Sequence, residues 1–264
     1  MTATTLGIGV VVLVLGVGAV CALVLHKVRR IHLMMFAVKS DAEQTRREVE
    51  ALYRQIESLE ALNRLLALST PLPPLRGWAG SPDFLLAIAR HALRAKPRRM
   101  VECSSGASTI VLARCAQLSG CGHVFSLEHD PDYARQTRAE LASRDLAAWA
   151  TVVDAPLLPC PAVGGQAWYS LAGLSDGHAP VDMLVIDGPP QSTAPLARYP
   201  ALPMLWPKLD PDCVAFLDDA ARSDEAAAVR RWLQEFPSLR AVSIPCEKGC
   251  FRLSSSSTDV EDLR

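Results

Sequence analysis

Carboxylate side chains stand at the ends of five short apolar runs in this 264-residue sequence. They are Glu102, Glu128, Asp154, Asp187 and the pair Asp218-Asp219. If the runs are parallel strands of one sheet, their carboxyl ends meet at the edge where open α/β sheets bind ligands. Carboxylates there suit a ligand rich in hydrogen-bond donors or positive charge. The simpler alternative is that one or two of them only cap the helix that follows.

The first of these runs leads into a turn made of small residues. Residues 100–109 read as an apolar strand, a Ser/Gly turn and the start of a helix that continues over residues 110–118. Small residues let the backbone approach a ligand closely, and the first turn of a helix has free N–H groups. Such a unit is typical of nucleotide-binding α/β proteins. A dinucleotide-binding dehydrogenase needs three glycines, whereas this turn has only Gly106.

Strand-like and helix-like patterns alternate through the region that carries the acids. Strands are predicted at residues 100–102, 123–128, 150–154, 182–187 and 213–218, followed by a final pair at 239–245 and 249–253. Helices are predicted at residues 83–95, 110–118, 131–143 and 224–236, with a weaker pattern at 194–206 that Pro200 and Pro203 interrupt. This alternation predicts an α/β fold with a mostly parallel seven-stranded sheet covered on both faces.

The N-terminal end has the features of a membrane anchor. Residues 6–25 form an uninterrupted apolar run, which as a helix reaches about 30 Å, the thickness of a bilayer core. Residues 1–5 carry no charged side chain, and Lys27, Arg29 and Arg30 follow the run. The alternatives to an anchor are a cleaved signal peptide, which this order disfavours, and a buried helix. By the positive-inside rule it predicts a single-pass anchor in the cell membrane, with the N-terminus outside and the rest of the chain cytoplasmic.

A long helix without proline or glycine is predicted between the anchor and the α/β domain. A heptad seam runs along it through Met35, Val38, Ala42, Thr45, Val49, Leu52, Ile56, Leu59, Asn63 and Leu66. We expect a homodimer through this coiled coil; the alternative is one amphipathic helix lying on the domain or the membrane. The predicted organisation is an anchor at 1–30, the long helix at 31–68, a Pro-rich linker at 69–80, the domain at 81–253 and a disordered tail at 254–264.

The composition argues against two other classes of protein. The formal net charge of −1 gives no basic footprint for nucleic acid. The eight cysteines are scattered, and none forms paired CxxC units, so a structural zinc site is not expected. Cys246 and Cys250 read as two ordinary thiols that flank a turn, and a reduced compartment fits best.

Together the acids and the turn resemble class I S-adenosylmethionine-dependent methyltransferases over about residues 76–253. Glu102 and the turn look like the family's first motif, acid-x-Gly-x-Gly-x-Ser-Thr, with Ser104 where the first glycine is usual. The resemblance implies a Rossmann-like methyltransferase fold, in which Glu128 binds the ribose hydroxyls and Asp154 the adenine amino group. The implied cofactor-binding residues are Glu102, Ser104, Gly106, Ser108, Thr109, Glu128, His129, Asp154 and Asp187.

Two later motifs are similar to those of metal-dependent O-methyltransferases. In that group an acid after the fourth strand and two residues after the fifth hold a divalent cation, which implies a Mg²⁺ site at Asp187, Asp218 and Asp219. The ion would orient an acceptor hydroxyl and lower its pKa. Asp187 and His129 are the implied catalytic residues. The alternatives stay open: Asp219 only caps the next helix, and His129 is only solvated.

Together with the anchor predicted from residues 6–25, the resemblance implies a membrane-anchored methyltransferase that modifies an oxygen of a small-molecule or envelope-precursor acceptor, with or without a divalent metal. Trp168 and Tyr169 either line the acceptor pocket or pack over the sheet. Arg198 either reaches an anionic substrate or pairs with nearby acids. The alternative function, from a different class, is a dimeric membrane scaffold that binds the cofactor without turnover.

Overall fold

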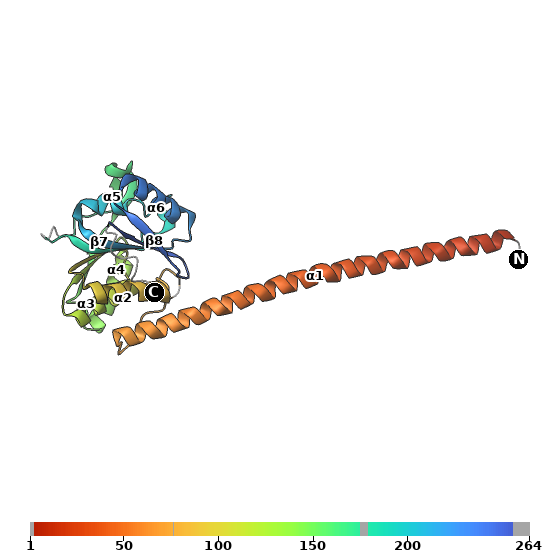
Figure 1. Ribbon diagram of the computed structural model, residues 1–264, viewed down its shortest axis with the longest axis horizontal. Coiled ribbons are helices and arrows are strands. Elements are labelled where there is room, and N and C mark those ends of the chain that lie inside the picture. The colour runs from red at the N-terminus through yellow and green to blue at the C-terminus, as the bar shows by residue number, and fades with distance from the viewer. Residues whose placement is uncertain (1–2, 76, 175–178, 256–264) are drawn as a thin grey trace. The chain divides into compact units, whose positions relative to one another are not determined.

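The computed structural model describes residues 3–75, 77–174 and 179–255, without the side chains of residues 3–12, 37, 47 and 162. Two compact units divide the chain, Met1–Tyr53 and Arg54–Arg264. The first unit is helical, and the second contains the sheet and the helices that cover it (Figure 1). The candidate site lies entirely in the second unit.

A seven-stranded sheet forms the centre of the second unit. Its order is β3-β2-β1-β6-β7-β9-β8, and β9 alone runs against its neighbours within it, so the predicted mostly parallel sheet is confirmed. Chain order reverses between β1 and β6, which is where such sheets bind ligands. The strands are β1 (Arg99–Cys103), β2 (His123–Glu128), β3 (Ala150–Asp154), β6 (Val181–Ile186), β7 (Leu209–Asp218), β8 (Arg240–Ile244) and β9 (Cys250–Ser254).

Helices cover both faces of the sheet (Figure 1). One apolar cluster takes side chains from α2 (Pro82–Ala95), α3 (Ala107–Ser119) and α4 (Pro131–Ser143). The other takes them from α5 (Ala201–Leu205) and α6 (Ser223–Glu235). The structure therefore has helices wherever the sequence predicts strong ones. The weaker pattern at 194–206 yields only the short α5 and the 3₁₀ turn η3 (Trp206–Lys208), because prolines remove donors there.

A separate antiparallel pair of strands was not predicted. It consists of β4 (Leu157–Cys160) and β5 (Gln166–Tyr169), joined through the 3₁₀ turn η1 (Pro161–Val163). Pro159 lies in the middle of β4, and proline within a run argues against a strand. A second 3₁₀ turn, η2 (Gln191–Thr193), follows β6. The β4–β5 pair matters for the site because β5 ends on Tyr169, which lines the cavity described below.

The helix α1 (Ala3–Leu66) is continuous, and its last turns belong to the second unit. Leu62 and Leu66 are fully buried there, and Gln55 donates a hydrogen bond to Asp83 on α2 (2.7 Å). Leu66, predicted as the last seam residue, therefore packs in the domain core. The long helix is confirmed, and its pairing with a second copy stays a prediction.

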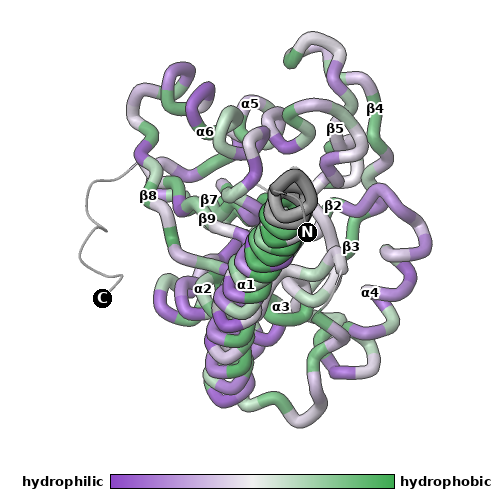
Figure 2. The backbone as a smooth tube through the Cα atoms, turned by 90° about the vertical axis from the view of Figure 1, so that its right-hand side faces the viewer, coloured by the Kyte–Doolittle hydropathy of each residue, from purple (hydrophilic) through white to green (hydrophobic). Residues whose placement is uncertain are grey.

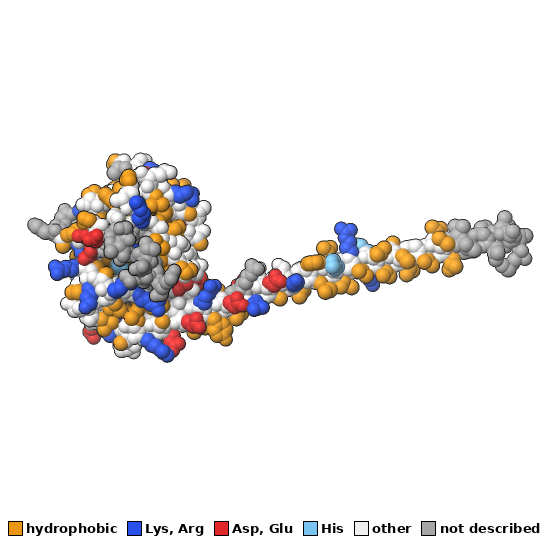
Figure 3. All heavy atoms as spheres, in the orientation of Figure 1, with side chains coloured by type: hydrophobic (Ala, Val, Ile, Leu, Met, Phe, Trp, Pro, Cys, Tyr) orange, Lys and Arg blue, Asp and Glu red, His pale blue; other side chains and the backbone are white. Residues whose placement is uncertain are grey.

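Hydrophobic side chains are exposed along the first unit, among them those of Leu13, Val17, Val20 and Leu25. Figure 3 shows them as orange side chains along α1 with charged ones between them, and the tube of α1 in Figure 2 has both hydrophobic and hydrophilic segments. Within the described residues, however, no helix combines the length and the apolar character needed to cross a membrane. The predicted anchor starts at residues 6–12, whose side chains lie outside the described part, and it is not confirmed. Residues 256–264 of the predicted tail also lie outside the described residues.

Candidate functional site

A cavity of about 430 Å³ opens at the carboxyl edge of the sheet, beside the reversal point between β1 and β6. This volume falls in the range of small-molecule sites, roughly 300–1,000 Å³. The wall is formed by the β1–α3 turn, the ends of β2, β6 and β7, one face of α4 and part of the linker before α2. The predicted site residues that line it are Ser104, Gly106, Ser108, Glu128, His129, Asp187 and Asp219.

Beneath the turn, Glu102 holds the N-terminal end of α3 in place. Its Oε2 accepts hydrogen bonds from the hydroxyls of Thr109 (2.6 Å) and Ser126 (2.7 Å), while Thr109 Oγ1 accepts one from Gly106 N (3.0 Å). Burial raises the pKa of Glu102, against the lowering effect of these hydroxyl donors. Glu102 and Thr109 lie outside the cavity wall, so they support the turn rather than line the cavity.

The turn itself contains two residues with positive φ angles, Ser104 (126°) and Gly106 (140°). Glycine adopts such angles readily, whereas a residue with a Cβ is strained there. A Cβ added at Gly106 would meet no atom within 4 Å, so only backbone conformation selects glycine at this position. The serine at 104, where the sequence motif usually has glycine, therefore sits in a backbone conformation that glycine would adopt more easily.

Glu128 presents its carboxylate to the cavity from the end of β2. Its Oε2 accepts a hydrogen bond from Ser105 Oγ (2.8 Å), and its Oε1 accepts one from Asp130 N (2.9 Å). His129 Nδ1 lies 3.1 Å from Oε1, and its ring meets Tyr169 edge-on. Hence Glu128 is a fixed acceptor at the cavity wall, and His129 lies beside it.

Asp154 is not brought to the cavity. It ends β3, the outermost strand on its side of the sheet, and its side chain is 71% exposed. The carboxylate accepts a hydrogen bond from Arg138 on α4 (2.6 Å). The role implied for it at an adenine ring has no support in this arrangement.

One face of α4 supplies wall residues that sequence reasoning missed. Tyr133, Gln136, Thr137 and Glu140 all line the cavity, and Thr137 Oγ1 shares a 3.1 Å hydrogen bond with Ser105 Oγ. Their spacing of three and four places them on one side of a helix. The spacing was available in the sequence, although only the fold shows that this side faces the cavity.

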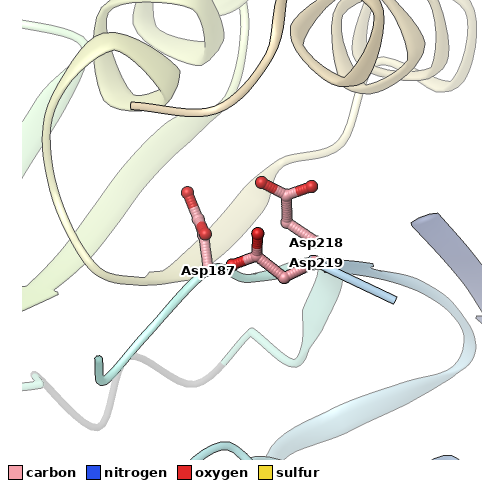
Figure 4. Close-up of side chains that lie close together, drawn as sticks. All are labelled: Asp187, Asp218 and Asp219. Atoms are coloured by element: carbon pink, nitrogen blue, oxygen red, sulfur yellow. The ribbon is translucent and has the colours of Figure 1, made fainter. Parts of the chain in front are cut away.

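Three aspartates converge at the other end of the cavity, as predicted. Asp187 follows β6, and Asp218 and Asp219 end and follow β7, with carboxylate oxygens within 4.8 Å of one another. The carboxylate of Asp219 turns toward Asp187 in Figure 4. Asp187 and Asp219 line the cavity, whereas Asp218 is fully buried behind it.

The guanidinium group of Arg198 lies among these acids, which settles between its two predicted roles in favour of pairing with acids. Its Nη2 donates to Asp219 Oδ2 (2.6 Å) and to Asp187 Oδ1 (3.2 Å), and its Nη1 donates to the backbone oxygen of Asp218 (2.9 Å). The side chain is only 4% exposed. Arginine suits a buried position that links several acceptors, because its donors form a rigid planar fork.

Burial dominates the proton affinities of this acidic cluster. It raises the pKa of Asp187 to about 7, with Arg198 acting in the opposite direction. It raises the pKa of Asp218 to about 8, and the neighbouring carboxylates of Asp187 and Asp219 add to the effect. Asp187 thus combines access to the cavity with a pKa near neutrality.

The cluster does not fit the predicted magnesium site. A Mg²⁺ ion bound by Asp187 and Asp219 would lie about 2.1 Å from their oxygens. Arg198 Nη2 already lies between two of those oxygens, and its positive charge would repel a cation. Asp218 does not line the cavity, although Mg²⁺ needs room for its remaining water or substrate ligands. The prediction that the three acids meet is confirmed. A guanidinium group already pairs with the carboxylates of Asp187 and Asp219, the two acids that line the cavity, whereas the carboxylate of Asp218 has no hydrogen-bond partner among the described residues.

Tyr169 and Gly188 form the wall between the Glu128 end and the acidic end. Tyr169 is almost fully buried and lines the cavity, while its neighbour Trp168 packs in the core. A Cβ added at Gly188 would collide with the Tyr169 hydroxyl and approach Cys103 O to 3.1 Å. Glycine is therefore required directly after Asp187 for this close approach.

Residues 101–220 match the family described as a methyltransferase domain. A comparison with curated proteins gives no match. Among solved structures, the chain is similar to an O-methyltransferase from Bacillus cereus in complex with SAH, with a TM-score of 0.52 and 18% identity, covering 75% of this chain and 90% of that one.

Two further solved structures give the same result. TomG, an O-methyltransferase from Streptomyces achromogenes involved in tomaymycin synthesis and solved with SAM, has a TM-score of 0.51 and 17% identity, covering 78% of this chain and 94% of that one. A cofactor-bound protein from MTB has a TM-score of 0.50 and 23% identity, covering 78% and 89%. At these identities the similarity is one of fold, and it confirms the Rossmann-like arrangement of the domain.

Proposed function

We propose that this chain transfers the methyl group of S-adenosylmethionine to a hydroxyl oxygen, because residues 101–220 match a methyltransferase family and the sheet has the Rossmann-like arrangement. The acceptor is a small molecule or an envelope precursor. The observation that carries the proposal is a single cavity that joins the Gly106 turn and Glu128 to the carboxylate of Asp187. One end of this cavity suits the cofactor, and the other suits the acceptor.

The cofactor end has the donors and acceptors that an adenosine group requires. The start of α3 provides backbone N–H groups beside Gly106, and Glu128 provides a carboxylate for a pair of ribose hydroxyls. Ser105 holds one oxygen of Glu128 and can be displaced by a stronger donor. When bound, S-adenosylmethionine supplies an electrophilic methyl group on a sulfonium centre.

At the acceptor end, Asp187 is suited to act as a general base. Its Oδ1 accepts a hydrogen bond from Arg198, which leaves Oδ2 for the proton of the acceptor hydroxyl. A base with a pKa of about 7 removes a proton efficiently at neutral pH. We assign His129 to the cofactor end instead, because its ring stands beside Glu128. The rest of the rate enhancement comes from holding the hydroxyl oxygen in line with the methyl group.

Two variants test this division of the cavity. Glu128→Ala should weaken cofactor binding about 10- to 100-fold, since it removes a charged hydrogen-bond acceptor. Asp187→Asn should leave cofactor binding unchanged and lower kcat by about 10²- to 10⁴-fold. Calorimetric titration with S-adenosylhomocysteine and label transfer from radioactive cofactor measure the two effects. Equal losses of binding in both variants would contradict the assignment.

The alternative function is a membrane scaffold that binds the cofactor without turnover. The strained Ser104 favours it, because that residue departs from the glycine of the motif. Incubating the purified chain with labelled cofactor and either membrane or cytosolic extract separates the two functions. Cofactor binding without label transfer to any fraction would support the scaffold.

We also propose that the chain is a homodimer held at the cell membrane, with the domain on the cytoplasmic side. The apolar run at residues 6–25, the basic residues after it and the exposed seam residues Val38, Val49, Leu52 and Ile56 support this. Carbonate extraction of membranes tests the anchor, because a peripheral protein is released. Analytical ultracentrifugation of a truncated chain that begins at Ser40 tests the dimer, and a strictly monomeric species would refute it.

A further inference from the structure

We propose that Arg198 is a built-in cation that replaces the divalent metal at the acidic end of the cavity and positions Asp187 for catalysis. Methyl transfer by this chain is then independent of divalent metal. The catalytic part of this inference rests on the proposed function, whereas its metal-binding part does not. The argument starts from where the guanidinium group lies.

Arg198 connects the ends of two adjacent strands. Its Nη2 contacts Asp187 after β6 through both Oδ1 (3.2 Å) and the backbone oxygen (3.1 Å), and Asp219 after β7 through Oδ2 (2.6 Å). Its Nη1 reaches the backbone oxygen of Asp218 (2.9 Å). A metal ion bound by Asp187 and Asp219 would link the end of β6 to the end of β7. The guanidinium group of Arg198 already links these two strand ends.

Arg198 and its neighbours in the chain are held by contacts with α6. Its Nε lies 3.6 Å from Glu225 on α6, and Leu196 N donates to Asp224 Oδ2 (3.1 Å). Trp232, also on α6, donates from Nε1 to the backbone oxygen of Tyr199 (2.9 Å). The segment on either side of Arg198 is thereby fixed to α6, unlike a mobile surface arginine.

Two guanidinium groups already oppose the negative charge of Asp219. Arg222 Nη1 contacts Asp219 Oδ2 (2.9 Å), so Asp219 receives two guanidinium groups on one oxygen. A divalent cation at Asp187 and Asp219 would have to separate the buried Arg198 from both of these carboxylates, or bind beside its guanidinium group against charge repulsion. Metal binding is therefore disfavoured as long as Arg198 is present.

Arg198 acts on the reaction through Asp187, which makes it a positioning residue. The contacts of Nη1 and Nη2 are with the protein, and one of them holds Oδ1 of Asp187, a residue that lines the cavity. A metal would bind the acceptor oxygen directly and lower its pKa. With an arginine in this position, the carboxylate of Asp187 removes the proton of the acceptor hydroxyl. General-base catalysis by Asp187 therefore takes the place of activation by a metal ion.

The metal-binding part is tested with Mn²⁺ on the full chain, by electron paramagnetic resonance and calorimetry. We expect no stoichiometric binding by the wild type at millimolar Mn²⁺. In Arg198→Gln, which removes the guanidinium group between Asp187 and Asp219 and leaves Arg222 on Asp219, we expect one Mn²⁺ per chain. The matched control is Arg135→Gln. Arg135 lies on α4 and forms an exposed ion pair with Asp132, so this variant should behave as wild type. One tightly bound Mn²⁺ in the wild type would overturn the proposal.

The catalytic part is tested with Arg198→Lys, which keeps the charge and loses the planar fork. We expect a fall in kcat of at least tenfold with unchanged affinity for S-adenosylhomocysteine, and wild-type activity that survives EDTA. Loss of wild-type activity in EDTA, with recovery on adding Mg²⁺, would overturn the inference. Circular dichroism checks that each variant is folded. If no acceptor is methylated under any condition, the proposed function fails while the Mn²⁺ result still decides the metal question.

Discussion

At the scale of single residues, the turn between β1 and α3 has backbone strain at Ser104, and a substitution can remove it. Ser104 has a φ angle of 126°, which costs a residue with a Cβ roughly 1–3 kcal/mol. Gly106 has a similar angle and is already glycine. Replacing Ser104 by glycine should therefore relieve strain in this turn, and replacing Gly106 by alanine should introduce it.

Ser104→Gly should stabilise the domain by about 1 kcal/mol, because relief of strain outweighs the greater freedom of glycine in the unfolded chain. Gly106→Ala should destabilise it by a similar amount or more, through backbone conformation alone. Urea denaturation followed by circular dichroism measures both free energies of unfolding. A destabilised Ser104→Gly variant would mean that the serine side chain contributes more than its strain costs.

The protonation of Asp187 should be visible in the pH dependence of the reaction. Burial raises its pKa to about 7, so the carboxylate that must accept the proton is lost as pH falls through this value. We expect kcat/KM to decline tenfold per unit of pH below about 7. Asp187→Asn should have a low activity without this decline, whereas His129→Gln should retain it. A decline that disappears only in the His129 variant would make the histidine the base.

At the scale of elements, the last turns of α1 are part of the domain core. Leu62 and Leu66 are fully buried, while Leu65 between them is 37% exposed. Arg114 on α3 donates to the backbone oxygens of Leu66 (2.9 Å) and Ala67 (3.2 Å), which closes the end of the helix against the domain. A domain cut off at the predicted linker would lack this packing.

Leu62→Ala should lower the free energy of unfolding by about 2–5 kcal/mol, the usual cost of a cavity at a buried leucine. Leu65→Ala is the control and should cost less than about 1 kcal/mol. Chemical denaturation of a truncated chain that begins at Ser40 measures both. Equal costs would show that the end of α1 does not stabilise the domain.

The elements that the sequence predicted well carry strong local patterns. The strands β2 and β3 and the helix α4 occur at the predicted residues, because apolar runs, Asp130 as a cap and Pro131 in the first turn mark them locally. The β4–β5 pair has no such pattern, because Pro159 lies within β4 and proline within a run argues against a strand. Its place in the structure depends on contacts with distant residues.

The sequence predicts a site residue correctly where the place of its strand in the sheet alone decides whether the side chain reaches the cavity. Glu128 and Asp187 reach the cavity because β2 and β6 both adjoin β1. Asp154 does not, because β3 lies one strand further from the reversal point and Arg138 holds its carboxylate at the surface. The role of Arg198 depends on a loop that returns from β6 toward α6, and no spacing in the sequence encodes that return.

At the scale of the whole molecule, the buried acids make stability depend on pH. Burial raises the pKa values of Asp187 to about 7 and of Asp218 to about 8, both from 3.8. For a carboxyl group with a raised pKa, the folded state binds the proton more tightly than the unfolded state. The stability it contributes is complete below about pH 4 and is lost as pH rises through the folded-state pKa.

The melting temperature should therefore fall between pH 6 and pH 9. Asp218→Asn should reduce this fall, because the variant cannot ionise at that position. Asp132→Asn, whose side chain is 81% exposed, is the control and should leave the slope unchanged. Differential scanning calorimetry in buffers of constant ionic strength measures the slopes. Identical slopes for wild type and Asp218→Asn would show that Asp218 is not a buried acid with a raised pKa.

The strand order has a consequence for how the protein is made on the ribosome. In the sheet β9 lies between β7 and β8, although it is the last of these strands to be synthesised. Until β9 emerges, the edge of β7 has no partner, and β8 has no neighbour to pair with. An unpaired central strand edge is prone to aggregation, so the nascent chain needs protection during this interval. The acids that end β7 acquire their final setting only when that last strand is in place.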